Sequence, residues 1–179
     1  MNNVFLTGFM ATGKTAVGRA LARRLARRFI DLDGEIERAA GLAVSEIFAR
    51  FGEPEFRARE RQALVSLCAS EGAVIATGGG SVSDPRNRDA MRASGTIVCL
   101  TATPQAILAR LGDRDDRPLL AGPTGRAERV ASLLAERAAA YADADLTVDT
   151  SRKSADEVAR SIVDWLSSSP RAAKASSEA

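Results

Sequence analysis

The sequence predicts an α/β domain in which a parallel β-sheet is covered by helices on both faces. Short apolar runs of strand length alternate with longer segments of helical periodicity. The short runs are apolar at nearly every position, as expected of strands buried on both faces. A chain of 179 residues that is 45% hydrophobic fits one compact domain. We assign this domain to residues 1–166 and expect the small, polar residues 167–179 to form a disordered tail.

The first half of the chain alternates strands and helices around glycine-rich turns. Pro54 favours the start of a helix, since proline fits the first helical turn. The elements that we expect are a strand at 3–7, a helix at 16–29, a short strand at 29–31, one or two helices at 33–51 divided at Gly41, and a helix from Pro54.

The second half continues the alternation. Asp84-Pro85 and Thr103-Pro104 each combine an N-cap residue with a proline at the first helical position. Residues 112–125 are polar and rich in Gly and Pro, which predicts a mobile loop. The expected elements are strands at 73–76, 96–100 and 145–149, and helices at 85–93, at 104–111, after residue 125 as far as Tyr141, and as far as Leu166.

Composition excludes several classes of function. The chain has no histidine, which excludes a Ser-His-Asp triad, a histidine-ligated metal and a histidine general base. The net charge of +2 is too small to favour a nucleic-acid or membrane partner, and we expect the arginine-rich face of the first helix to be solvated. No membrane span or signal peptide is visible. Two cysteines form neither a disulfide framework nor a zinc site, so we expect a cytoplasmic protein.

Residues 8–15 (GFMATGKT) match the P-loop pattern G-x-x-x-x-G-K-[ST]. The segment follows a predicted strand and opens a predicted helix, which is the context that this motif requires. Backbone N–H groups of such a loop surround phosphate oxygens, and the helix N-terminus adds positive potential. Lys14 would then reach the β- and γ-phosphates and the Thr15 hydroxyl would bind Mg²⁺. The alternative is an ordinary glycine turn before a helix.

Asp31 and Asp33 follow the second strand, where open α/β sheets place their ligands. Alternating side chains at a strand end would point both carboxylates toward the P-loop crevice. One could approach a metal ion, and the other could accept a hydrogen bond or a proton from a hydroxyl substrate. The alternative is that Asp33 caps a helix beginning at Gly34.

Arg57 and Glu60 lie three residues apart on a predicted helix, where a simple intrahelical ion pair is one interpretation. The other is that Glu60 holds Arg57 so that its planar guanidinium grips a carboxylate. The glycines of Thr77-Gly78-Gly79-Gly80 leave room for a ligand and expose N–H donors, although a flexible turn would also explain them.

Two further arginines are candidates for anion binding. Arg117, followed by Pro118-Leu119-Leu120, lies in the predicted loop at 112–125, which suits a lid that brings positive charge to a phosphoryl group. Arg137, four residues before Tyr141, could be a second anion-binding group or a surface partner of a nearby acid.

Together these motifs resemble shikimate kinases. The matching segments are GFMATGKT, DLD, GEPEFRARE, TGGG, RPLL, RAAAY and VDT, in the order and at the spacing of that family, over residues 4–166. The resemblance implies a nucleoside-monophosphate-kinase-like, three-layer α/β/α fold whose five-stranded parallel sheet has the order 2-3-1-4-5. It also implies transfer of the γ-phosphate of ATP to the 3-hydroxyl of shikimate, a step of aromatic amino acid (chorismate) biosynthesis. The reaction would require Mg²⁺, and the enzyme would be a monomer.

The resemblance assigns roles to individual residues. Lys14, Asp33 and Arg117 match the catalytic positions, with Asp33 the candidate base, and Thr15 and Asp31 match the metal side, Asp31 through water. Shikimate-binding positions match Asp33, Arg57, Gly78, Gly79, Gly80 and Arg137. ATP-binding positions match Ala11, Thr12, Gly13, Lys14, Thr15, Ala16, Arg110 and Arg117, with Arg152 or Lys153 on the adenine side. Ala11 replaces a glycine common in the family loop, which is tolerable if its φ stays negative.

Other activities remain open at this point. A gluconate kinase shares the loop and the overall fold, although EFRARE and TGGG argue against it. A nucleoside monophosphate kinase would need contacts for a second base and a second phosphate. A P-loop module that binds nucleotide without turnover is a third alternative, against which stands the set formed by Asp33, Lys14 and Arg117.

Overall fold

The computed structural model describes residues 2–112 and 125–169 of the chain. Its centre is a five-stranded parallel sheet with the strand order β2-β3-β1-β4-β5, as the sequence analysis expects. The strands are β1 (Asn3–Thr7), β2 (Arg28–Asp31), β3 (Ala73–Ala76), β4 (Gly95–Thr101) and β5 (Leu146–Asp149).

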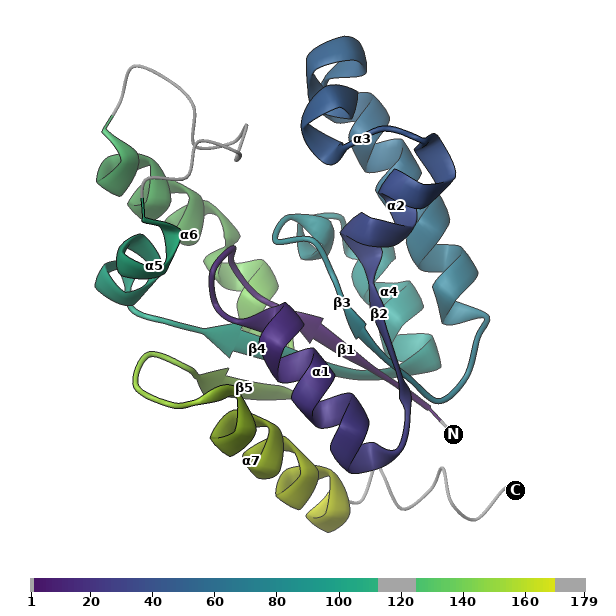
Figure 1. The fold of residues 1–179 in the computed structure, drawn as a ribbon, viewed down its shortest axis with the longest axis vertical. Coiled ribbons are helices and arrows are strands. Elements are labelled where there is room, and N and C mark those ends of the chain that lie inside the picture. The colour runs from purple at the N-terminus through teal and green to yellow at the C-terminus, as the bar shows by residue number, and fades with distance from the viewer. Residues whose placement is uncertain (1, 113–124, 170–179) are drawn as a thin grey trace.

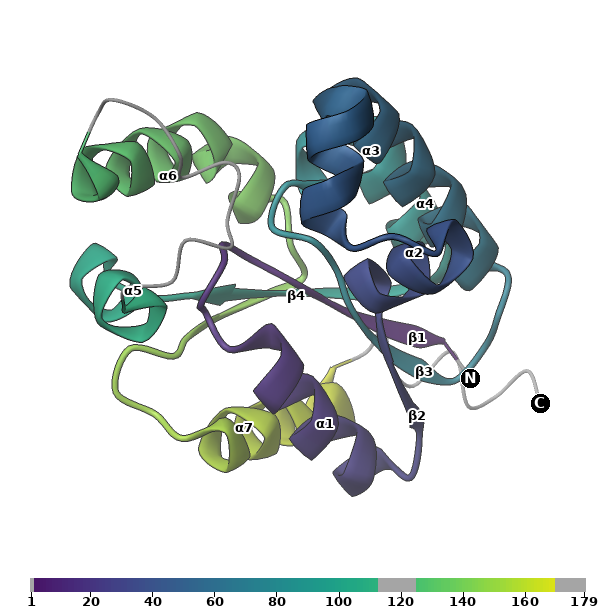
Figure 2. The same ribbon diagram turned by 45° about the horizontal axis from the view of Figure 1, so that its top comes forward.

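Helices cover both faces of this sheet and complete a three-layer α/β/α arrangement (Figures 1 and 2). The helices α1 and α7 lie on one face, and α2 to α6 lie on the other. Their bounds are α1 (Lys14–Leu25), α2 (Leu32–Ala40), α3 (Val44–Cys68), α4 (Pro85–Ser94), α5 (Pro104–Leu111), α6 (Arg126–Ala142) and α7 (Ala155–Ser168), with a short 3-10 helix η1 (Ser81–Ser83).

The strands separate two hydrophobic cores. Alternate residues of β1 face opposite sides of the sheet, so Val4 and Leu6 pack with α1 and α7 while Phe5 packs with the helices of the other layer. All three side chains are fully buried. The two-sided burial therefore explains why the middle positions of the central strands are apolar.

The helices α4 and α5 begin at the N-cap residues that the sequence predicts. The Asp84 side chain accepts a hydrogen bond from the Arg86 backbone N–H, and Pro85 opens α4. The Thr103 side chain accepts from the Ala106 N–H at the start of α5. Each cap satisfies an N–H that has no partner inside the helix.

Some expected boundaries are wrong. The first helix ends at Leu25 instead of continuing to residue 29, because Ala26 adopts the left-handed conformation (φ 53°) and reverses the chain into β2. By contrast, the expected break between a helix ending at residue 51 and one starting at Pro54 is confirmed, because the segment from Val44 to Cys68 is kinked at Gly52, whose φ of 79° interrupts the helix. The last helix continues past Leu166 to Ser168. The expected lid at 112–125 and the tail at 167–179 lie mostly outside the described residues.

None of the helices in the described part of the chain combines the length and the apolar composition needed to cross a bilayer. The arginine-rich face of α1 is largely solvated, as expected, since Arg19, Arg23, Arg24 and Arg28 are exposed.

Candidate active site

The P-loop joins the carboxyl end of β1 to the N-terminus of α1. Gly8 has a φ of 123°, and a Cβ at this position would lie 2.1 Å from the Leu100 carbonyl oxygen, so glycine is required by both conformation and space. Gly13, with a φ of 96°, forms the N-cap of α1. The Lys14 ammonium donates to the carbonyl oxygens of Gly8 and Phe9, at 2.9 Å each, and is thereby held over the loop. The predicted strand–loop–helix geometry is confirmed.

Ala11 departs from the expectation stated for it. Its φ is 60°, not negative, so an alanine occupies a left-handed position that glycine adopts without strain. Neighbouring groups fix the loop at this point, since Arg110 Nη1 donates to the Ala11 carbonyl oxygen at 3.2 Å and to Thr150 Oγ1 at 3.0 Å. Thr150 Oγ1 in turn donates to the Thr12 carbonyl oxygen at 2.9 Å. The segment after β5 thus supports the loop.

Asp31 and Asp33 take different places in the fold. Asp31 ends β2 and its Oδ2 accepts a hydrogen bond from Thr15 Oγ1 at 3.0 Å. Asp33 is not at the strand end, nor does it cap a helix at Gly34, because α2 already begins at Leu32 and Asp33 lies in its first turn. A helical turn, instead of strand alternation, therefore directs the Asp33 side chain.

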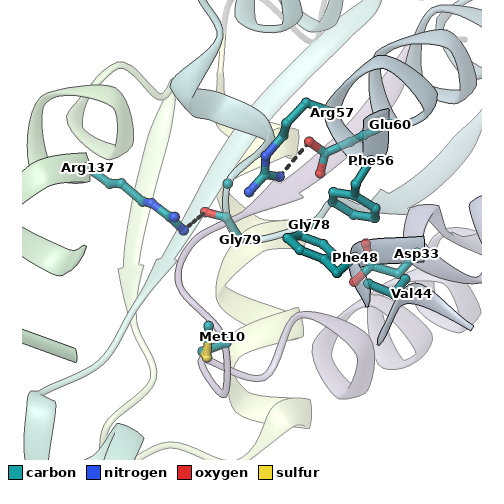
Figure 3. Close-up of a pocket in the computed structure, with 11 residues that line it drawn as sticks. Met10, Asp33, Val44, Phe48, Phe56, Arg57, Glu60, Gly78, Gly79 and Arg137 are labelled. Atoms are coloured by element: carbon teal, nitrogen blue, oxygen red, sulfur yellow. Dashed lines mark hydrogen bonds and ion pairs between the residues drawn. The ribbon is translucent and has the colours of Figure 1, made fainter. Parts of the chain in front are cut away.

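Two cavities meet at Asp33. The first, which we call the P-loop cleft, has a volume of about 750 Å³ and is lined by Lys14, Thr15 and Asp31 among others. The second, which we call the arginine pocket, is shown in Figure 3 and contains Arg57 and Arg137. Both cavities are lined by Met10, Asp33, Val44 and Gly79. A carboxylate therefore stands where the two spaces join.

Arg57 is held in place by a buried carboxylate. Its Nη1 donates to Glu60 Oε2 at 2.8 Å, and the Glu60 side chain is only 1% exposed. The second oxygen of Glu60 accepts a hydrogen bond from the buried hydroxyl of Ser81. Burial alone would lower the pKa of Arg57, but the carboxylates of Glu60 and Glu53 outweigh burial and raise that pKa above its ordinary value. The intrahelical pair and the ordered guanidinium are thus one and the same arrangement.

The glycine triplet after β3 is required by close approach. A Cβ at Gly78 would lie 2.5 Å from Glu60 Oε1, and one at Gly80 would lie 2.5 Å from Arg57 Nη2. At Gly79 it would lie 3.3 Å from the Met10 backbone nitrogen. The triplet therefore lets the arginine pocket and the P-loop pack against one backbone segment, which a merely flexible turn would not require.

Arg137 reaches the same segment from α6, as Figure 3 shows. Its side chain is buried, and Nη1 donates to the Gly79 carbonyl oxygen at 3.3 Å, so the alternative of a surface partner for a nearby acid is wrong. The hydroxyl of Tyr141, one helical turn later, donates to the same oxygen at 2.6 Å. Sequence reasoning did not assign Tyr141 a role, although its spacing of four from Arg137 was the available signal.

The remaining predicted residues are not brought into either cavity. Arg152 and Lys153 are exposed in the turn after β5, and Arg110 is exposed beside the P-loop. Arg117 lies outside the described residues. Ser81 was missed because its contact with Glu60 joins residues 21 positions apart, whereas the i,i+4 spacing of Glu53 and Arg57 was an available signal.

The donor set on the P-loop side suits magnesium. A hydroxyl and a carboxylate, Thr15 Oγ1 and Asp31 Oδ2, lie in hydrogen-bond contact at the cleft wall. Mg²⁺ prefers hard oxygen ligands and is commonly held by one or two such groups together with substrate phosphates. Among the described residues there is no cluster of three or more acidic or cysteine side chains that would hold a metal alone.

Comparisons with known proteins agree with this geometry. A family model described as shikimate kinase matches residues 10–167. Two curated relatives named shikimate kinase are those of Geobacter metallireducens, 48% identical over 93% of this chain and 92% of its own length, and of Geobacter sulfurreducens, 50% identical over 92% and 90%. A solved shikimate kinase from Acinetobacter baumannii, in complex with shikimate, is 36% identical, with a TM-score of 0.90 over 94% of each chain.

Proposed function

The chain belongs to the shikimate kinase family, and from this premise we propose that it transfers the γ-phosphoryl group of ATP to the 3-hydroxyl of shikimate, a step of aromatic amino acid (chorismate) biosynthesis. The observation that carries the proposal is the junction of the two cavities at Asp33. A phosphate-binding loop lies on one side of this carboxylate and a pair of buried or half-buried arginines lies on the other. A phosphoryl donor and an acidic alcohol would therefore meet there.

The arginine pocket fits a small molecule with one carboxylate and several hydroxyls. Arg57 and Arg137 are ordered by protein partners before any ligand binds, so their guanidinium groups lose little freedom on binding an anion. Asp33 and the backbone of Gly79 line the pocket and could bind hydroxyl groups of such a ligand. Phe48, Phe56 and Val44 line the same pocket and would pack against the carbon ring of shikimate.

Phosphoryl transfer would then proceed in line across the junction. The Asp33 carboxylate orients the attacking hydroxyl and accepts its proton as the new oxygen–phosphorus bond forms and the bond to the ADP oxygen breaks. Lys14 and the N–H groups of the P-loop stabilise negative charge on the transferring group. Bound at Thr15 and Asp31, Mg²⁺ would neutralise charge on the phosphates of ATP. We assign Arg117 a similar role because it matches the lid arginine of the family.

Two further parts of the proposal concern the setting of the enzyme. Cys68 and Cys99 are both free thiols, which fits the reducing cytoplasm. One chain supplies both cavities, which fits a monomer.

A coupled assay of ADP release tests the proposal. We expect ADP formation that requires shikimate and is absent with gluconate or with nucleoside monophosphates as acceptors. Preference for gluconate would favour a sugar-acid kinase. ATP binding without turnover on any of these acceptors would favour a nucleotide-binding module and would contradict the proposal.

A further inference from the structure

Arg57 is held by a second carboxylate in addition to Glu60. Glu53 lies four residues earlier on the same helix, and its Oε1 accepts hydrogen bonds from both Nε and Nη2 of Arg57, at 3.1 and 2.9 Å. The edge of the guanidinium formed by Nε and Nη2, one of those that present two N–H groups to a carboxylate, is therefore occupied by the protein itself.

The charges around the two arginines make this contact significant. A further cavity, which we call the outer cavity, adjoins the arginine pocket and shares Arg57 and Arg137 with it. Among the described residues that line these two cavities, Arg57 and Arg137 are the only cations, whereas the acidic residues are Asp33, Glu53, Glu60, Asp84 and Glu136. A ligand carboxylate would therefore add another negative charge to a set of residues in which acidic side chains already outnumber the cations.

The two carboxylates on Arg57 differ in their freedom to move. Glu60 is 1% exposed and is fixed by Ser81 on its other oxygen, so its release would leave a buried charge without a counterion. The Glu53 side chain is 47% exposed, and water would solvate its carboxylate as soon as the contact opened. Of the two, Glu53 is the carboxylate that an incoming anion can displace.

We propose that Glu53 acts as a built-in competitor for the carboxylate subsite of the arginine pocket and thereby limits how tightly that subsite holds an anion. The proposal rests on the proposed function, because it concerns how tightly that pocket binds and releases an acidic ligand. A ligand must replace the Glu53–Arg57 contact or bear the repulsion of the Glu53 charge, so anions that offer only a carboxylate bind weakly. Ligands that also fill the hydroxyl contacts overcome this cost. The phosphorylated product keeps the carboxylate, so the same competition favours its release.

The test compares Glu53→Gln with the wild type in direct binding titrations. Glutamine keeps the oxygen that accepts from Arg57 and removes only the charge. The ligands are shikimate, its uncharged methyl ester, and benzoate as a carboxylate without hydroxyls. Glu55→Gln is the matched control, since Glu55 lies on the same helix, pairs with Arg59 at 2.8 Å in the same i,i+4 geometry, and is 42% exposed.

We expect Glu53→Gln to bind shikimate and benzoate about 1.5- to fivefold more tightly, which is the range for removing one partly exposed like charge. The methyl ester should bind equally to both proteins, and Glu55→Gln should behave as the wild type with all three ligands. A merely structural role of Glu53 would change all ligands alike.

Unchanged or weaker carboxylate binding by Glu53→Gln would overturn the proposal and would identify Glu53 as an additional anchor of Arg57. Equal tightening of the ester would overturn it as well, because charge would not be the cause. Failure of the wild type to bind shikimate is a different result, which contradicts the proposed function. In that case the benzoate comparison still decides whether Glu53 competes for the carboxylate subsite.

Discussion

Tyr141 contributes to the free energy of unfolding in two ways that can be measured separately: through a buried hydrogen bond and through a shifted pKa. The side chain is 7% exposed and its hydroxyl donates to the Gly79 carbonyl oxygen at 2.6 Å. Burial raises the pKa of Tyr141 to about 12 from an ordinary value of 10.0, against the opposing influence of the Arg137 charge. Between about pH 10 and 12 the hydroxyl therefore stays protonated in the folded protein, whereas it ionises in the unfolded chain.

The magnitude follows from the difference between these two pKa values. Below about pH 10 both states are protonated and the full stability is present; between about pH 10 and 12 only the unfolded chain loses its proton, so stability falls as pH rises. Two pKa units correspond to about 2.7 kcal/mol of unfolding free energy. Tyr141→Phe removes this dependence and, at neutral pH, loses about 1 kcal/mol with the hydrogen bond to Gly79.

The two stability curves should therefore cross. Because the wild type starts about 1 kcal/mol higher and loses that amount by about pH 10.7, denaturant unfolding should show Tyr141→Phe to be the more stable protein above about pH 11. Since the chain contains one tyrosine, its ionisation can also be followed directly by near-ultraviolet absorbance in native and denatured protein. Parallel stability curves over the whole range, or a native titration near the ordinary value, would refute the argument.

Three further changes test the site and its loop. Asp33→Asn should slow single-turnover phosphoryl transfer by about 10²–10⁴ while shikimate still binds with modest loss; a near-normal transfer rate with lost binding would make Asp33 a substrate ligand only. Arg57→Ala should weaken shikimate binding by roughly 1.5–3 kcal/mol and leave ATP binding nearly unchanged, whereas Arg59→Ala should affect neither ligand. Equal losses for both ligands would indicate a general structural defect. Ala11→Gly should raise the unfolding free energy by about 0.5–1 kcal/mol, since it relieves a left-handed alanine, and the same change at the helical Ala131 should lower it by about 1 kcal/mol. A loss of stability at position 11 would speak against strain in the loop.

The parts of the fold that local sequence determines were predicted correctly. The middle positions of the central strands are apolar because both faces of the sheet are buried, and that pattern is legible in a single sequence. The cap at Asp84 depends on a contact two residues away, and the P-loop is recognisable because its glycines, Lys14 and Thr15 lie in one segment. Type and order of the elements follow from such signals.

Other features depend on contacts that no local pattern contains. Tyr141 and Gly79 are 62 positions apart, so the bond between them cannot be inferred from either segment. Asp33 was placed at a strand end because alternation was extended past Asp31, whereas the chain turns into α2 at that residue. Ala11 has a positive φ against the preference of alanine, and the carbonyl oxygen of this residue accepts a hydrogen bond from the distant Arg110.

The same distinction explains how the arginine pocket is organised. A P-loop is a local device, because the backbone and one lysine of a single segment form the phosphate site. A carboxylate site built from arginines needs partners that hold each guanidinium, and here they come from distant segments: Ser81 acts on Arg57 through Glu60, and the Gly79 carbonyl holds Arg137. Because that same glycine also lines the P-loop cleft, a shift of its backbone would displace both halves of the site together. Tyr141 shares with Arg137 the hydrogen bonds to this carbonyl that oppose such a shift, so its effect on stability is coupled to the geometry of the site.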